Sequence, residues 1–137
     1  MTTLDIDLAR QVLAAQPFSV LLEARVEVFE PQRAVLALDV RDDLKQQNGF
    51  LHGGVLAYAA DNAITFAAGT VLGPEVLTSG VTINYVRPAA GTELQAEAVV
   101  VYSGRRQAVC RCDLFVVGPD GERVQCAVAQ GTVLAVG

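Results

Sequence analysis

The feature that most constrains this chain is an apolar run over residues 50–72 that carries a single acid, Asp61. The run is long enough to cross a membrane, but it also contains His52, Asn62 and Thr65. An Asp alone costs roughly 2.5 to 3.5 kcal/mol at the centre of a bilayer. Because the flanking segments alternate like the strands of a soluble sheet, we expect a helix buried inside a globular domain and no membrane span.

Six extended segments are expected around this helix. In residues 22–30, Leu22, Ala24, Val26 and Val28 alternate with charged residues, and residues 33–40 show the same strand period. Four more follow the helix, with hairpin-like breaks between them: residues 76–87, 92–103, 107–117 and 122–135. These breaks are too short for the crossover helices of a parallel sheet. The sequence predicts an α+β fold, with an antiparallel sheet of about six strands around one long central helix, in a single domain over residues 1–137.

The first residues, "MTTLDIDLARQVLAAQP", predict a short amphipathic helix that Pro17 ends. Its apolar stripe is expected to consist of Leu4, Leu8, Val12 and Ala15. Asp5 and Asp7 precede the first basic residue, so the segment lacks the basic start of a secretory signal. A cytoplasmic location is the expectation that follows.

Composition and charge limit the partners of the chain. The net charge is −5 with no run of Lys or Arg, which argues against a nucleic-acid or anionic-membrane surface. The sequence is 52% hydrophobic over only 137 residues, which is more apolar than so small a domain needs. Some of this apolar surplus is expected to face another subunit.

The three cysteines, Cys110, Cys112 and Cys126, cannot all pair within one chain. Cys110 and Cys112 share one face of a strand if that segment is extended. We interpret all three as small core residues in a reducing compartment, with metal ligands or a nucleophile as the alternatives.

The sequence "HGG" at the predicted helix start supplies a site for a developing negative charge. The first turn of a helix has free N–H groups and the positive end of the helix dipole, and glycines let a ligand approach closely. A carbonyl oxygen against the N–H of Gly53 or Gly54 would be polarised there. The alternative is that both glycines only permit a tight entry into the helix.

Asp61 lies eight residues after Gly53, so the two are about 12 Å apart along a helix axis. One chain therefore cannot aim both groups at one carbonyl. Two chains with antiparallel central helices could, because each helix start would lie beside the middle of the other helix. We expect a largely apolar surround for Asp61, with the hydroxyls of Tyr58 and Thr65 nearby. The carboxylate is either catalytic or only a hydrogen-bonding group across a subunit interface.

His52 is the only histidine of the chain. The metal hypothesis is poor because no second His, Cys or carboxylate stands at metal-ligand spacing, and no well-placed Ser or Cys nucleophile accompanies it. We favour a residue whose ring braces the loop by a hydrogen bond near the helix start.

The segments "QQNGFLHGGVLAYAADNA" and "LTSGVTINYVRPAAGTELQAEAVVVYSGRR" together resemble the hotdog-fold acyl-CoA thioesterases, specifically the PaaI-like (phenylacetate-degradation type) group. That group shows a Gly three before the His, then HGG, an Asp in "D-x-A", a strand ending in an aromatic residue, "x-R-P-A", and a "G-R" turn. The match runs from about residue 4 to residue 135. The resemblance implies a hotdog fold and hydrolysis of a thioester between an acyl group and coenzyme A.

The resemblance also implies roles for individual residues. The Gly53 N–H would polarise the thioester carbonyl, and Asp61 of the neighbouring subunit would act as nucleophile or general base. Relatives often carry an Asn six residues before the His, and it helps to place the carboxyl group or the water. This chain has Gln46 at that position, so the role falls to Gln46 or to Asn48. Thr78 stands where relatives have Ser or Thr near the attacking water, with an ordinary strand residue as its alternative.

Coenzyme A is multiply anionic and would be part of the substrate, so no separate cofactor and no metal are expected. We assign Gly54, Arg87, Arg105 and Arg106 to its binding, the arginines through charge-assisted bonds to phosphates. A solvated surface role is the alternative for each arginine.

The function expected is that of an acyl-CoA thioesterase that forms homodimers and pairs them into homotetramers, and two other functions are the alternatives. One is a hotdog module that binds acyl-CoA without hydrolysing it, and the other is a hotdog dehydratase or hydratase. Asp61 favours the hydrolase, because a pure binding pocket gains nothing from a carboxylate beside a thioester. The sequence leaves open the acyl group, the choice between nucleophile and general base, and the arrangement of a tetramer.

Overall fold

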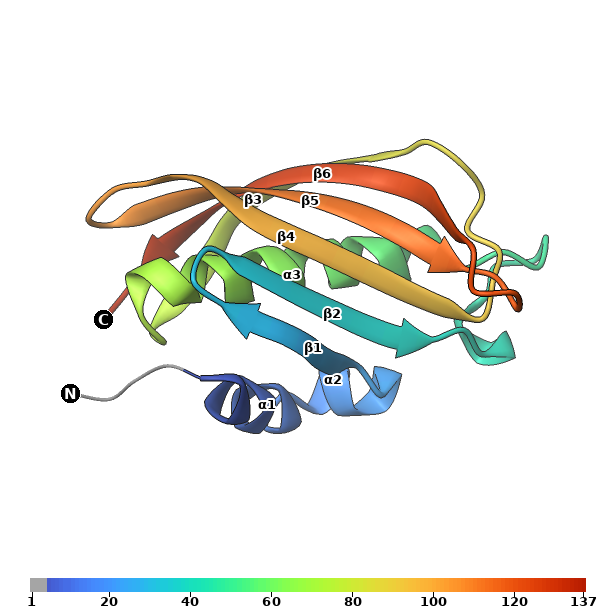
Figure 1. The fold of residues 1–137 in the computed structure, drawn as a ribbon, viewed down its shortest axis with the longest axis horizontal. Coiled ribbons are helices and arrows are strands. Elements are labelled where there is room, and N and C mark those ends of the chain that lie inside the picture. Colours follow the sequence, from blue (N-terminus) through green and yellow to red (C-terminus); the bar gives the residue numbers. More distant parts are fainter. Residues whose placement is uncertain (1–4) are drawn as a thin grey trace.

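The computed structural model describes residues 5–137, which form six strands and three α-helices (Figure 1). The helices are α1 (Ile6–Ala14), α2 (Pro17–Leu22) and α3 (Gly53–Leu72), with a short 3-10 helix at Asp42–Leu44. The strands are β1 (Arg25–Glu30), β2 (Arg33–Asp39), β3 (Val76–Tyr85), β4 (Glu93–Ser103), β5 (Gln107–Val117) and β6 (Arg123–Ala135).

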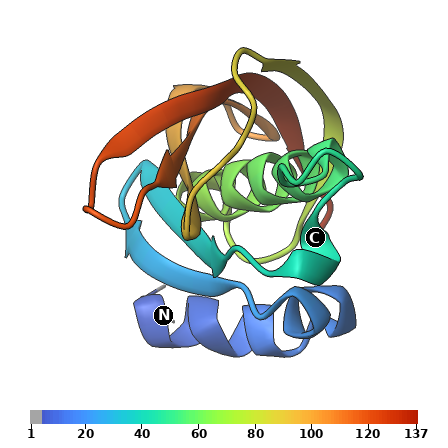
Figure 2. The same ribbon diagram turned by 90° about the vertical axis from the view of Figure 1, so that its right-hand side faces the viewer.

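The strands form one antiparallel sheet in the order β1-β2-β4-β5-β6-β3, so β1 and β3 are its edges. The sheet curves around α3, which runs along its concave face (Figures 1 and 2). α1 packs against β1 at one edge of the sheet, and α2 follows it along the bottom of the molecule (Figure 2). The predicted architecture of an antiparallel sheet around one long helix is confirmed.

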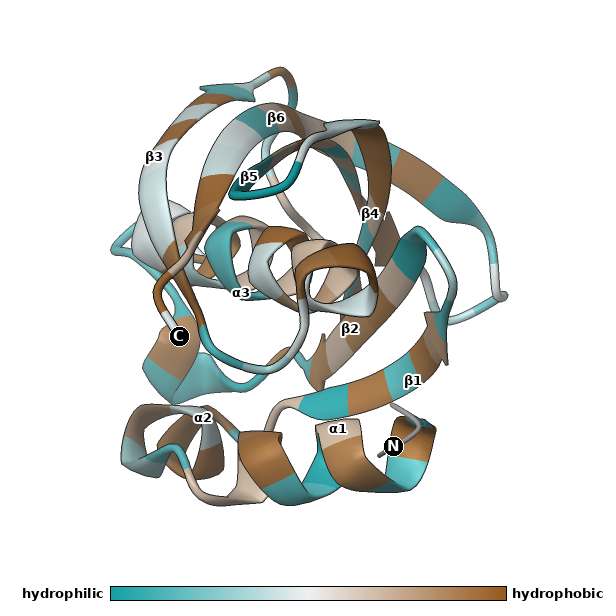
Figure 3. Ribbon diagram, turned by 90° about the vertical axis from the view of Figure 1, so that its left-hand side faces the viewer, coloured by the Kyte–Doolittle hydropathy of each residue, from teal (hydrophilic) through white to brown (hydrophobic). Residues whose placement is uncertain are grey.

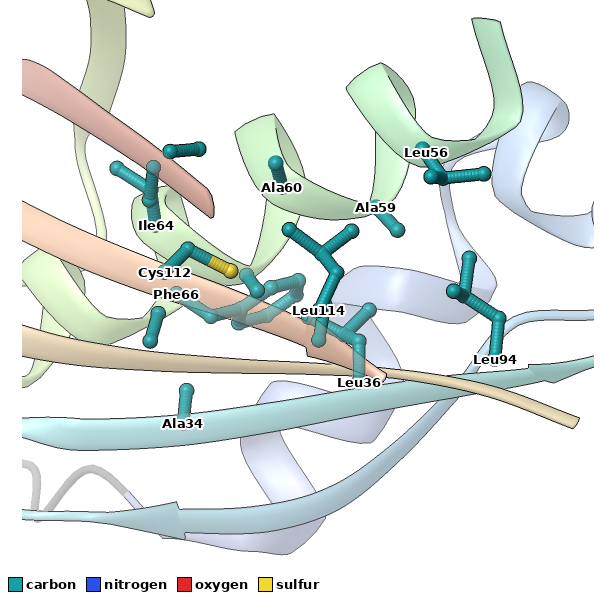
Figure 4. Close-up of a cluster of buried hydrophobic side chains, with 14 of the residues drawn as sticks. Ala34, Leu36, Leu56, Ala59, Ala60, Ile64, Phe66, Leu94, Cys112 and Leu114 are labelled. Carbon is teal, nitrogen blue, oxygen red and sulfur yellow. The ribbon is translucent and has the colours of Figure 1, made fainter. Parts of the chain in front are cut away.

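The core lies between α3 and the sheet (Figure 4). Alanines dominate the face of α3 that is turned to the sheet, and their small side chains let the strands approach closely. The central layer includes the fully buried Ala60, Ile64, Leu94 and Leu114. α3 is long and apolar enough to pass for a membrane span, but 56% of its most apolar window is buried inside the fold. It is a core helix, as the flanking strands predicted.

The N-terminal segment differs from its prediction. Pro17 follows the end of α1 but also begins α2, because its fixed φ suits the first turn of a helix. α1 buries Ala9 and Leu13, whereas Val12 is 41% exposed, so the predicted stripe was wrong. The residue at position 4 lies outside the described residues. Leu22, expected in the first strand, is the last residue of α2.

The first strand also changes phase along its length. The pairing of β1 with β2 shifts between Val26 and Val28, which is a β-bulge at Glu27. After the bulge, Phe29 packs against the core and meets Phe66 edge to face, with ring centroids 6.3 Å apart. The prediction that Val28 shares the core face with Val26 was therefore wrong.

The cysteines are core residues, as predicted. Cys110, Cys112 and Cys126 are free thiols and completely buried. Burial raises the pKa of Cys110 and of Cys126 to about 11, and it raises the pKa of Cys112 as well. These thiols stay protonated near neutral pH, so they are poor nucleophiles and poor metal ligands.

A polar cluster around the buried Ser19 joins the N-terminal helices to α3. The Ser19 hydroxyl is 1% exposed, accepts a hydrogen bond from the Tyr58 hydroxyl at 2.6 Å and donates to Gln16 Oε1 at 2.6 Å. Asn62 Nδ2 donates to Gln16 Oε1 at 3.0 Å and to the Tyr58 oxygen at 3.1 Å. Such satisfied networks fix one arrangement of the elements that they join.

We expect Ser19→Ala to lower the free energy of unfolding by about 1 to 3 kcal/mol, because it leaves Tyr58 and Gln16 without their buried partner. Urea denaturation at one fixed protein concentration measures the loss. Thr92→Ala is the matched control, since it removes an exposed hydroxyl and is expected to change stability by less than about 0.5 kcal/mol. Equal losses in the two variants would contradict a structural role for the cluster.

Candidate functional site

The start of α3 is organised by its N-cap residue, His52. The His52 ring accepts a hydrogen bond at Nδ1 from the Gly54 N–H at 2.8 Å, and the His52 N–H donates to the Leu44 carbonyl at 2.9 Å. The ring therefore braces the loop as the sequence predicted. Because His52 occupies the Gly54 N–H, Gly54 is not a free donor for a ligand, and its predicted contact with coenzyme A would have to use another atom.

The Gly53 N–H, in contrast, has no acceptor among the described residues, so it is a free donor at the positive end of the helix dipole. The Gly53 carbonyl accepts a hydrogen bond from the Tyr85 hydroxyl at 3.1 Å. A β-carbon at Gly53 would lie 3.2 Å from the Tyr85 ring, which explains why a glycine fits here. Tyr85 was not predicted as a site residue, although it is the aromatic residue before "VRPA".

The loop before α3 carries Gln46 and Asn48. Gln46 Oε1 accepts a hydrogen bond from the Asn48 N–H, and the Gln46 backbone bonds with Phe50 and Gly49. Gly49 has φ +86°, a left-handed conformation that glycine adopts at little cost. The Gln46 side chain thus closes the turn. The Asn48 side chain is exposed and makes no hydrogen bond with any of the described residues.

These groups surround one open cavity of about 570 Å³. Gln46, Asn48 and Gly53 line it from the loop and the helix start. Tyr85 and Arg87 line it from the end of β3 and the residues that follow. We call this set the amide half-site. It brings together four of the residues that the sequence analysis selected, and it adds Tyr85.

Arg105 and Arg106 do not lie near the amide half-site. They form the turn between β4 and β5, at the end of the sheet where α3 finishes, and the Arg106 carbonyl accepts from the Ala135 N–H at 2.8 Å. Figure 1 shows this turn at the opposite end of α3 from the helix start. Within one chain, the structure separates these two arginines from Arg87.

Asp61 stands at the middle of α3 beside two threonines. The Thr78 hydroxyl donates to Asp61 Oδ1 at 2.6 Å, and the Thr65 oxygen lies 2.6 Å from the Thr78 oxygen and 2.8 Å from the Asp61 carbonyl oxygen. Each hydroxyl has one proton. When Thr78 donates its proton to Asp61 Oδ1, the Thr65 hydroxyl is left to donate to the Thr78 oxygen or to the Asp61 carbonyl oxygen. We call these three residues the carboxylate half-site. Asp61 Oδ2 has no hydrogen-bond donor among the described residues.

The surroundings of Asp61 differ from the prediction. In the single chain Asp61 is exposed, so the expected apolar surround is not formed there. Of the two hydroxyls expected beside it, that of Thr65 is present, but that of Tyr58 is directed to Ser19. Thr65 was predicted only as a helical neighbour of Asp61; its contact with Thr78 depends on how β3 lies against α3.

The two half-sites face the same uncovered side of the molecule. Gly54, Ala57 and Asp61 follow one another at helical spacing along a stripe of α3 that the sheet does not bury. The strand beside this stripe is β3, which is a sheet edge and is mostly exposed. Gly53 and Asp61 are separated by eight residues of continuous helix, or about 12 Å along the axis. The geometry thus keeps the two half-sites apart within one chain, as the spacing predicted.

Within residues 5–137, no three His, Cys, Asp or Glu side chains come together to hold a metal ion. The chemistry available from the described side chains is therefore that of a backbone donor, a carboxylate with hydroxyl partners, and cationic side chains.

The comparisons with known proteins agree with this architecture. The family model described as "Thioesterase superfamily" matches residues 48–121, which include both half-sites except Gln46. A search of the curated proteins found no match.

Three solved structures illustrate the similarity. A thioesterase family protein from Silicibacter pomeroyi is 32% identical with a TM-score of 0.88, over 93% of this chain and 96% of the other. A protein from Thermus thermophilus is 34% identical with a TM-score of 0.75, over 88% and 98%. The PaaI protein of the Escherichia coli phenylacetic acid degradation operon is 24% identical with a TM-score of 0.81, over 94% and 91%, and shows the same fold. The hotdog fold and the thioesterase resemblance predicted from the sequence are confirmed.

Proposed function

The chain belongs to the thioesterase superfamily, and we propose that it hydrolyses acyl-coenzyme A thioesters at active sites that two subunits build together. The observation that carries this proposal is the unused Gly53 N–H at one point of α3 and the threonine-held Asp61 at another. Each group has a role in hydrolysis, but neither reaches the other within one chain.

The amide half-site would bind the thioester carbonyl. An oxygen that accepts a hydrogen bond from the Gly53 N–H also lies at the positive end of the α3 dipole, and both effects strengthen as negative charge develops on it. Tyr85 holds the Gly53 carbonyl at 3.1 Å and so fixes this peptide unit. Asn48 lines the same cavity and is the free amide there, whereas the Gln46 amide is occupied in the turn.

The carboxylate half-site would supply the attacking group. Thr78 holds Asp61 Oδ1 at 2.6 Å and leaves Oδ2 for the reaction. As a general base, Asp61 takes a proton from water, the hydroxide adds to the carbonyl carbon, the carbon–sulfur bond breaks, and the thiolate of coenzyme A receives a proton. As a nucleophile, Asp61 first forms a mixed anhydride and releases the thiolate, and water then hydrolyses the anhydride. Both routes give a free acid and coenzyme A.

A two-fold dimer would join the half-sites. Pairing of two β3 edges would place the exposed stripes of two α3 helices side by side and antiparallel, with Gly53 of one subunit beside Asp61 of the other. The same pairing would cover Asp61 with the apolar surround that it lacks in the single chain. Further pairing of dimers into tetramers remains part of the proposal.

Cations near the joined site would hold the phosphates of coenzyme A. Arg87 lines the amide half-site cavity. Arg105 and Arg106 lie at the far end of their own chain, so they would meet the substrate only from the partner subunit, where an antiparallel pair turns that end toward the helix start.

Release of free thiol from a panel of acyl-CoA esters, graded in length and branching, tests the proposal. Hydrolysis of at least one ester is the expected result. A protein that binds these esters and releases thiol from none of them is a binding module, and the proposed activity would then be wrong.

A further inference from the structure

A second cavity, of about 130 Å³, lies between α1, α3 and β1, away from the amide half-site. Figure 3, viewed toward the C-terminal end of α3, shows α1 below β1 and α3 with apolar segments along it. The apolar residues that line the cavity are Leu8, Val12, Phe29, Phe66, Gly69 and Val76 among others. We call it the α1 pocket.

The α1 pocket reaches the carboxylate half-site at Thr65, which lines one of its walls. The Thr65 hydroxyl is 2.6 Å from that of Thr78, which in turn holds Asp61. An acyl group inside the pocket would therefore extend away from the carbonyl carbon that Asp61 or its water attacks. The opposite wall is α1, and the hydrogen bond from Asn62 Nδ2 to Gln16 Oε1, 3.0 Å long, ties the residue between α1 and α2 to α3.

Gly69 lines the α1 pocket, and its missing side chain leaves part of the pocket empty. A β-carbon built at Gly69 meets no atom within 4 Å, so no close contact requires a glycine there. Glycine inside a helix is less favourable than alanine, and φ at Gly69 is not in the left-handed range. A residue that costs helix stability and leaves room in a pocket whose lining includes Thr65 of the carboxylate half-site is accounted for by a ligand that uses the room.

We propose that the α1 pocket binds the acyl group of the substrate, and that Gly69 sets the size limit. This inference rests on the proposed function. An apolar cavity of about 150 Å³ is known to stay dry and to admit benzene, so a pocket of this size fits an apolar group of about six carbons. The preferred substrates are thus compact, uncharged, medium-size acyl groups, not acetyl groups and not long chains.

Two non-hydrolysable thioethers, S-hexyl-coenzyme A and S-methyl-coenzyme A, test the pocket directly by calorimetry. In the parent protein, S-hexyl-coenzyme A is expected to bind at least about tenfold more tightly than S-methyl-coenzyme A, because its longer chain buries additional methylene groups. Gly69→Leu fills the pocket and is expected to remove most of this difference, with Gly69→Ala intermediate. Gln11→Leu is the control, since it introduces the same leucine side chain at an exposed position of α1 outside the pocket, and it should keep the difference.

Thermal unfolding checks the fold of the variants, and Gly69→Ala and Gly69→Leu are expected to be at least as stable as the parent because they improve the helix and fill a void. Equal affinities of the parent for the two thioethers, or an undiminished difference in folded Gly69→Leu, would overturn the pocket assignment. A parent that shows the difference but hydrolyses no ester would overturn the proposed function and leave the pocket as a binding site.

Discussion

Replacement of Asp61 by Asn is expected to lower kcat for thioester hydrolysis by about a thousandfold, within the range for loss of a general base or nucleophile. Asn has the same shape, and its amide oxygen still accepts the bond that Thr78 gives to Oδ1. The variant therefore removes the basic, nucleophilic oxygen and little else. Thiol release from the ester that the parent hydrolyses fastest gives kcat and KM separately, and KM is expected to change little.

The control for Asp61→Asn is Asp7→Asn, which removes one negative charge from the exposed first turn of α1. Activity of this control within about twofold of the parent shows that overall charge is not the cause. Asp61 is exposed in the single chain, so the variant is expected to fold with an unchanged or higher Tm. A folded Asp61→Asn protein with nearly full activity would show that the carboxylate has only a structural role.

Gly53→Pro is expected to lower kcat by about a hundredfold to a thousandfold, the usual effect of losing one oxyanion donor. Proline removes the N–H, and Gly53 is the first residue of α3, where proline is favourable. His52 has φ −62° and ψ 137°, the extended conformation that a residue before proline prefers. The three atoms nearest to the new β-carbon all belong to the side chain of Tyr85, which is 53% exposed.

Gly53→Ala separates the donor from the added bulk, because it places the same β-carbon against Tyr85 and keeps the N–H. We expect its kcat to stay well above that of Gly53→Pro in the same thiol-release assay. If the two variants lost activity equally, the effect would come from crowding near Tyr85, and the oxyanion role of the Gly53 N–H would be refuted.

Most of the fold could be predicted from the sequence because local periodicity and tertiary burial agree. Residues 107–117 alternate cleanly, and β5 has the same bounds. The failures lie where one extra residue or one special backbone position breaks the period. The bulge at Glu27 moved Phe29 to the core face, and Pro17 restarted a helix that it was expected to stop. No pattern in the sequence shows which strand positions bulge, since that depends on the partner strand.

The site was less predictable, because its residues come from elements whose relative position only the fold determines. The spacing of Gly53 and Asp61 was readable, since both lie on one helix. The contact between Asp61 and Thr78 depends on how β3 lies against α3, so the sequence supplied only the resemblance for it. The use of the Gly54 N–H by His52 was invisible in the sequence, although the brace itself was expected.

Several sequence-based predictions stay predictions. The cytoplasmic location, the single-domain extent over residues 1–137, the absence of a cofactor and the oligomeric state depend on properties that one chain does not display. The exposed edge of β3 and the uncovered carboxylate are the physical reasons to expect a partner subunit.

Complementation between two inactive variants tests the shared site most directly. Asp61→Asn and Gly53→Pro subunits are mixed in equal amounts under conditions that exchange subunits, and thiol release is compared with that of each variant alone. In a mixed dimer, Asp61 of one subunit meets Gly53 of the other and forms one intact site, so random exchange should restore about a quarter of the parent activity. If the mixture stays as inactive as its components although mixed dimers have formed, both groups act within one chain, and the shared-site account is wrong.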